Sequence, residues 1–225
     1  MTDTIFDLDR SPEATSICQH PEMKARCRVA QQQFTERGLP TRSHEKWRYM
    51  PIGHHLTGQT FFPVQANVGQ SMDPELEFWS NAFVVRCIDG QIHIEESLPQ
   101  GVEVLSLRQK LQQDPAAVLS ALDTAAWPDA TGLCDLNLAR LDEGVWIELA
   151  PDTQLTRPLQ LIYANRAMAD ATACHYHHWV HLGAGAHLTL IEDDQCHDQN
   201  QWYLLNNRLQ IQVDERASCQ MLQVR

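Results

Sequence analysis

The feature that most restricts the fold of this 225-residue chain is its final part, residues 144–225, where short β-like segments follow one another without a long helical pattern. Turn-forming residues such as Gly183-Ala184-Gly185 separate most of these segments. Strands of this length at near-regular spacing predict a sandwich, a jelly roll or a stacked β-solenoid. Periodicity alone does not choose among the three. The segments are VWIELA, LQLIY, HYHHWVHL, HLTLIED, WYLLNNRLQIQV and SCQMLQV.

The N-terminal half mixes helix and strand. Pro21 suits the first turn of a helix, and Gly38 is placed to end that helix in a left-handed conformation. Asp89-Gly90 predicts the turn of a β-hairpin, because both central positions of a type I′ turn need a positive φ. Two helical pieces are expected over residues 107–124, divided at Asp114-Pro115. The first helix should bury a stripe made of Met23, Cys27, Ala30 and Phe34.

A linker is predicted at Trp127-Pro128-Asp129. The chain is therefore expected to contain a mixed helical and β-hairpin N-terminal domain, residues 1–128, followed by a β-rich part, residues 129–225. A mass of 25.6 kDa is large enough for a hydrophobic core that needs no disulfides.

Charge and cysteine usage exclude several classes of protein. With 17 Lys and Arg against 29 Asp and Glu, the chain lacks the basic surface of a nucleic-acid platform. It has no apolar run of about 18 residues for a membrane span, and its acidic N-terminus is unlike a signal peptide, so we expect a cytoplasmic protein. Seven scattered cysteines without a Cys-x-x-Cys pair predict reduced, buried thiols rather than a disulfide framework or a zinc knuckle.

One segment, CHYHHWVH, holds four of the eleven histidines. On a strand, His175, His177 and His181 would share one face with Trp179, and His178 would point the other way. Two imidazoles at i and i+2 can hold zinc, iron, copper or nickel. The alternatives are a solvated strand face and a pH-responsive role.

Other motifs for chemistry are weak. The acidic run Glu192-Asp193-Asp194 is typical of a solvated turn rather than a ligand set. The sequence contains no Gly-rich phosphate loop followed by a helix, no Gly-x-Ser-x-Gly elbow and no His-Glu-x-x-His helix. Cysteine–histidine catalysis stays open, because its partners need not be close in sequence. We therefore assign no catalytic or metal-binding residue, and the cofactor-binding residues stay unknown.

A longer motif resembles a known family. The segment GLPTRSHEKWRY, Gly38 to Tyr49, is similar to the G-x-P-T-x-x-x-E-x-W-[KR]-Y-T pattern near the N-terminus of SufD-type members of the SufB/SufD family, with Met50 in place of the last Thr. These are scaffold subunits of the Suf iron–sulfur cluster assembly system. Residues 135–139, 144–147 and 157–161 resemble the family's LN-x-A, G-x-x-I and P-[IL]-x-[LI] segments in the same order. The resemblance covers residues 20–225.

The resemblance implies a right-handed parallel β-helix, incomplete here, whose first coils are residues 129–225. It implies pairing with a SufB-like subunit and a SufC-like ATPase. Iron–sulfur clusters would be held only transiently and a flavin only in the assembled complex, so no cofactor is expected on this chain. Family members are about twice as long, so we expect either an N-terminal portion or a shortened relative that closes its end by association. The family's ATPase-docking helices and cluster-assembly residues would follow Arg225, so we assign none of these roles to a residue of this sequence.

The leading hypothesis is therefore a non-enzymatic scaffold subunit. The alternative is a cupin-type, metal-dependent β-barrel enzyme that uses His175, His177 and His181 as ligands, although His187 and His197 fit a further ligand position poorly. A third hypothesis is a homodimeric interaction module that associates through an open β end.

Overall fold

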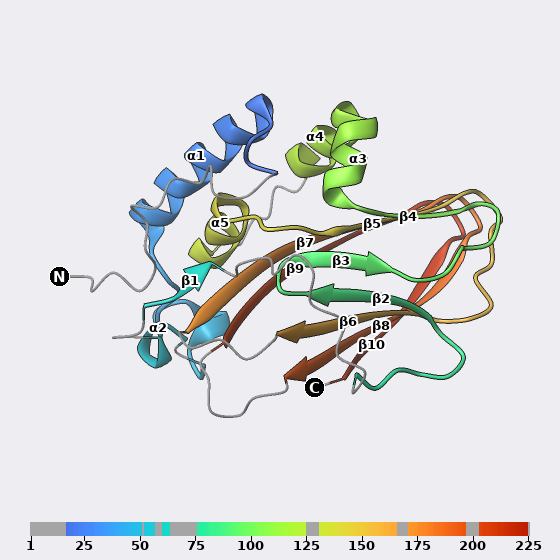
Figure 1. The fold of residues 1–225 in the computed structure, drawn as a ribbon. Helices are drawn as coiled ribbons and strands as arrows, with labels where there is room; N and C mark the ends of the chain where they lie inside the picture. Colours follow the sequence, from blue (N-terminus) through green and yellow to red (C-terminus); the bar gives the residue numbers. More distant parts are fainter. Residues whose placement is uncertain are drawn as a thin grey trace.

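The computed structural model describes residues 17–50, 52–56, 60–63, 76–124, 131–165, 171–196 and 203–224. They form two five-stranded sheets, with helices gathered on the outer side of one sheet (Figure 1). The expected mainly β class with a helix-containing N-terminal region is confirmed. No helix among these residues has the length and apolar character needed to cross a membrane. The linker at Trp127-Pro128-Asp129 lies outside the described residues, so the domain boundary at residue 128 stays a prediction.

The first sheet is built around β7 (Thr172–Leu182). β9 (Tyr203–Val213) pairs with β7 along its whole length and in parallel. On the other side of β7, β1 (Phe62–Pro63) pairs with its beginning and β5 (Val145–Leu149) with its end, both in parallel. β4 (Val102–Ser106) completes the sheet as the antiparallel neighbour of β5.

The second sheet has the order β10-β8-β6-β2-β3. Its elements are β2 (Phe83–Ile88), β3 (Gln91–Ile94), β6 (Leu159–Asn165), β8 (His187–Cys196) and β10 (Ser218–Val224). β2, β6, β8 and β10 run parallel to their neighbours, and β3 returns antiparallel to β2.

From β5 to β10 the chain changes sheet after every strand. β5, β7 and β9 lie in the first sheet and β6, β8 and β10 in the second, and each of the later strands pairs in parallel with the strand two elements earlier. Among the described strands the two sheets stay open and do not close into a barrel. The cupin-type alternative is therefore wrong in its architecture.

Alternation along the strands sends one set of side chains between the sheets. Val180 and Leu182 of β7 meet Leu161 of β6 and Leu190 of β8 there, and all four are buried in one apolar cluster. A slip of one residue would turn these side chains to the opposite face, so burial fixes the register.

Helices α3 (Leu107–Gln113) and α4 (Pro115–Thr124) cover the outer face of the first sheet (Figure 1). Trp146 of β5 and Trp179 of β7 stack there with ring centroids 5.6 Å apart, in one cluster with Leu107 of α3. The capping box of Ser106 and Gln109 begins α3. Asp114 accepts a hydrogen bond from the Ala117 N–H at 3.1 Å and Pro115 begins α4, so two short helices form instead of one.

Helix α1 (Pro21–Arg37) packs against α5 (Gly132–Ala139). Met23, Cys27, Ala30 and Phe34 are its buried residues, as the sequence predicted. Gly38 ends the helix at a φ of 66°, with its N–H donating to the Phe34 carbonyl at 2.7 Å. Two short helical turns follow, η2 (Glu45–Trp47) and α2 (Ile52–His55).

The two ends of the sheet pair differ. At one end, which we call the closed end, the hairpin turn has positive φ at Asp89 and Gly90, and the chain crosses from β3 to β4. Ile94, Leu98 and Val102 of this crossing pack against the main core. At the other end, the open end, β9 and β10 each pair with a single strand among the described residues.

Candidate functional site

The structure places the histidines of β7 on both faces, as the strand alternation predicted. His175, His177 and His178 are buried, and only His181 is partly exposed. The solvated-face interpretation is wrong for the three buried residues, because helices cover the outer face and the second sheet covers the inner one.

The three histidines of the metal hypothesis do not converge on one point. His175 Nδ1 lies 3.2 Å from Asn206 Nδ2. His177 borders a small apolar space beside Trp179, and His181 Nε2 lies 3.1 Å from Asp214 Oδ2. Burial lowers the pKa of both His175 and His177 to about 3. Within the described part of the chain, no group of three His, Cys, Asp or Glu side chains is arranged to hold a metal.

His178 belongs to a chain of hydrogen bonds between the sheets. The Val145 N–H donates to His178 Nδ1 at 3.1 Å, so this nitrogen carries no proton. The other ring nitrogen, Nε2, therefore carries the proton of the neutral ring. It donates to the Tyr163 hydroxyl oxygen, which lies 3.2 Å away. Burial lowers the pKa of His178 to about 3, which keeps the imidazole neutral.

The chain of hydrogen bonds ends on Glu192. The Tyr163 hydroxyl donates to Glu192 Oε1 at 2.8 Å, and Gln223 Nε2 donates to the second carboxylate oxygen at 2.8 Å. Glu192 and Asp193 lie within β8 and are buried. Asp193 accepts hydrogen bonds from Gln160 and Gln195, both at 2.9 Å. The solvated-turn interpretation of this acidic run is therefore wrong for Glu192 and Asp193, whereas Asp194, which also lies in β8, is exposed.

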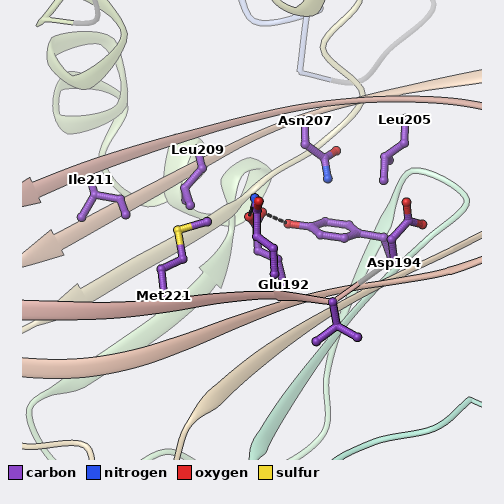
Figure 2. A pocket seen from close by; sticks show the side chains of 10 residues that line it. Glu192, Asp194, Leu205, Asn207, Leu209, Ile211 and Met221 are labelled. Atoms are coloured by element: carbon purple, nitrogen blue, oxygen red, sulfur yellow. Dashed lines mark hydrogen bonds between the residues drawn. The ribbon is translucent and has the colours of Figure 1, made fainter.

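A cavity of about 530 Å³ opens beside this chain, between β9 on one side and β8 and β10 on the other (Figure 2). Leu209 and Ile211 point into it from β9, and Met221 and Glu192 point into it from the opposite strands. One wall is thus apolar and the other carries carboxylates. The lining residues are Tyr163, Glu192, Asp194, Leu205, Asn207, Leu209, Ile211, Met221, Gln223 and Val224.

The cavity does not fit a flavin nucleotide. Glu192 and Asp194 would repel the phosphate of such a group, and the described lining contains no lysine or arginine to neutralise it. The interior thiols do not suit cluster ligation either. Burial raises the pKa of Cys87 and Cys174 well above the usual value, which disfavours the thiolate that iron requires.

The motif from Gly38 to Tyr49 forms the turn after α1. Its backbone is held locally, with the Thr41 N–H donating to His44 Nδ1 at 3.1 Å. Trp47 packs against the α1–α5 cluster, while Tyr49 is 92% exposed. Of the two aromatic residues of the motif, Trp47 therefore contributes to packing and Tyr49 lies on the surface.

The sequence did not predict that Tyr163, Glu192 and Gln223 belong to one buried chain of hydrogen bonds. A signal was present for Glu192, because Leu188, Leu190 and Glu192 share one phase of an alternating strand. The contacts with Tyr163 and Gln223 join three separate strands, and no local pattern contains them.

Comparison with known proteins identifies the family. Residues 11–161 match the model of the SufBD protein N-terminal region, which is more than half of the chain. The chain belongs to the SufB/SufD family. It is also similar to the iron-sulfur cluster assembly protein SufD of Escherichia coli (strain K12), with 22% identity over 163 residues, 72% of this chain and 36% of that relative. The aligned part is thus little more than a third of the relative's length.

The family resemblance stated from the sequence is confirmed by these matches. The family match includes the Gly38–Tyr49 motif and ends within β6, so strands β7 to β10 lie beyond it. The buried chain of hydrogen bonds and the cavity are therefore formed by β6 together with strands outside the matched region.

Proposed function

We propose that this SufB/SufD family member is a non-enzymatic scaffold subunit in iron–sulfur cluster assembly, which pairs with a SufB-like protein and a SufC-like ATPase. The observation that carries the proposal is the family match over residues 11–161, together with the similarity to SufD. The interior suits a rigid wall, because His178, Tyr163 and Glu192 satisfy one another's hydrogen bonds.

The finer architecture that we propose is a right-handed parallel β-helix, whose first coils are residues 129–225 and which comes after an N-terminal domain of residues 1–128. The alternation of β5 to β10 between two sheets supports it, since each coil would contribute one strand to each sheet. A coil of this kind buries little surface alone and is stabilised by the coil stacked on it. An experimental structure that shows a left-handed path or a third sheet would contradict the proposal.

In this proposal the iron–sulfur cluster is cargo of the assembled complex and not a resident group of this chain. A flavin, where one is used, would be held by other parts of the complex, because the open-end cavity has carboxylates and no cation in its described lining. The protein would work in the cytoplasm.

The open end is the surface that we propose for association. Its apolar side chains are exposed, and β9 and β10 offer strand edges to which a further strand can add. A SufB-like strand is the proposed occupant, and the competing ones are a second copy of the chain and a further coil of a longer chain.

The test is co-expression of the tagged chain with the SufB-like and SufC-like proteins of its source organism, followed by affinity and size-exclusion chromatography. We expect a complex that contains all three chains. Elution of the tagged chain without either protein would overturn the proposed function. Elution as a dimer of the chain alone would show that the second copy occupies the open end.

A matched pair of variants tests the surface separately. Met221 points into the open-end cavity, and its neighbour Gln220 lies on the opposite face of β10. Met221→Lys should reduce retention of the SufB-like protein, while Gln220→Lys should not. Equal retention with both variants would contradict the open end as the contact surface and leave the family-level function standing.

A further inference from the structure

Two cysteines lie together at the beginning of the first helix. Cys18 is in the turn that precedes α1, and Cys27 is on the buried stripe of α1. Both residues are fully buried, and their Sγ atoms are 2.7 Å apart. Both cysteines are free thiols in the structure, and a disulfide would bring the same two atoms to about 2.05 Å.

We propose that Cys18 and Cys27 are a reversible disulfide site that fastens the turn before α1 to the helix. The inference rests on the position of the two sulfur atoms and not on the proposed function. It differs from the expectation of simple reduced thiols, because the fold brings together two cysteines that are nine positions apart in sequence.

The surroundings of the pair explain why it would rest as thiols under reducing conditions. The hydrogen bond between the two cysteines, together with burial, raises the pKa of the Cys27 thiol. Ile17, which precedes Cys18, and Met23, one helical turn before Cys27, are fully buried members of the cluster under α3 and α4. Access to an oxidant therefore requires local opening of residues 17–20, which a backbone hydrogen bond from His20 N–H to the Ile17 carbonyl holds at 3.2 Å.

The reaction is thiol–disulfide exchange with a small disulfide such as oxidised glutathione. The thiolate of one cysteine attacks a glutathione sulfur, which forms a mixed disulfide and releases one glutathione thiolate. The second cysteine thiolate attacks the protein sulfur of that mixed disulfide and releases the second glutathione. The protein dithiol is oxidised, one oxidised glutathione is reduced to two thiols, and the two cysteine protons end on them.

Trypsin gives a direct readout, because Lys24 and Arg26 lie between the two cysteines and Arg28 directly follows Cys27. Residues 11–24 carry Cys18, and residues 27–28 carry Cys27. After incubation of the native chain with oxidised glutathione and alkylation of free thiols, we expect loss of both separate peptides. A linked peptide, two hydrogen atoms lighter than their sum, should replace them and disappear on reduction with dithiothreitol.

Cys134 provides the matched control, since it is partly exposed and lies on α5. Cys134→Ser should leave the linked peptide unchanged, while Cys18→Ser should abolish it. The oxidised chain should also melt about 5 °C higher than the reduced chain, because a short loop is closed in the unfolded state. Glutathione attached to Cys134 while Cys18 and Cys27 stay alkylated as separate thiols would overturn the proposal.

Discussion

The closed end and the open end are built from the same kind of strand, yet their side chains meet different surroundings. Val104 of β4, at the closed end, is 7% exposed, whereas Val213 of β9, at the open end, is 46% exposed. Met221 and Leu222 of β10 are similarly exposed, at 44% and 43%. Alternating apolar residues therefore mark which face of a strand points inward, but they do not show whether anything covers it.

The difference comes from the chain segments that lie next to each edge strand. At the closed end, β4 pairs antiparallel with β5, and the crossing from β3 brings Leu98 against the core. At the open end, β9 and β10 continue the parallel stacking, and the described residues contain no strand beyond them. An uncovered edge with apolar neighbours favours association with another strand.

The largest expected effect concerns acid stability in the covered region. Burial holds the pKa of His175, His177 and His178 at about 3, so the unfolded chain takes up their protons from about pH 6.5 downward and the folded chain does not. Burial raises the pKa of Asp142 to about 7, which acts in the opposite direction between about pH 7 and pH 4. Together these groups should lower the free energy of unfolding by up to about 3 kcal/mol per pH unit below pH 6.5.

Urea unfolding at pH 7 and pH 5 measures this effect. His178→Gln should weaken the pH dependence, because it removes one of the three buried imidazoles. Equal midpoints at the two pH values in the unmodified chain would contradict the burial of these histidines.

The next effect tests the tight packing near the closed end. A Cβ atom at Gly144 would collide with the backbone carbonyl of His177. Backbone hydrogen bonds hold both segments, since the His177 N–H donates to the Glu143 carbonyl and the Leu107 N–H donates to the Gly144 carbonyl. Gly144→Ala should therefore cost about 3 kcal/mol of stability. Gly53→Ala is the control, because a Cβ there meets its neighbours at ordinary contact distances, the nearest being 3.5 Å. Thermal melting of the two variants measures the difference. Equal melting temperatures would contradict the close packing of Gly144 against His177.

A smaller effect compares the two ends directly with one substitution. Val104→Ala removes two buried methyl groups and should cost about 2 kcal/mol. Val213→Ala makes the same change at an exposed position and should cost less than about 0.5 kcal/mol. Chemical unfolding of both variants gives the comparison, and similar losses at the two positions would mean that the open end is covered in solution.

The smallest effect concerns the chain of hydrogen bonds that borders the cavity. Tyr163→Phe removes the hydroxyl that lies between His178 and Glu192, and water from the cavity can replace part of the lost interaction. We expect a loss of about 1 kcal/mol. A double-mutant cycle with Gln223→Ala, which removes the other donor to Glu192, should show coupling between the two changes. Strict additivity would show that the two donors do not act on one carboxylate.

Much of the local structure could be predicted because its causes are local. The end of α1 at Gly38 and the hairpin turn at Asp89-Gly90 follow from φ preferences. The division of α3 from α4 follows from Asp114-Pro115. The opposite orientations of His177 and His178 follow from strand alternation.

The failures concern the elements that cover a strand face. Glu192 and Asp193 were expected in a solvated turn, but β6 and β10 flank β8 and bury both. His177 was expected on a solvated face or around a metal, but helices α3 and α4 occupy its side of β7. Burial of this kind depends on partners distant in sequence, so neither composition nor periodicity contains it.

Hydrogen–deuterium exchange of the 225-residue chain, followed by mass spectrometry of its peptides, tests the contrast between the two ends most directly. We expect slow exchange in β5 and β7, which have strand partners on both sides, and fast exchange in β9 and β10, whose outer edges have no partner among the described residues. Addition of the SufB-like protein should slow exchange in β9 and β10 and leave β4 and β5 unchanged. Slow exchange in β9 and β10 of the isolated, monomeric chain would contradict an open end.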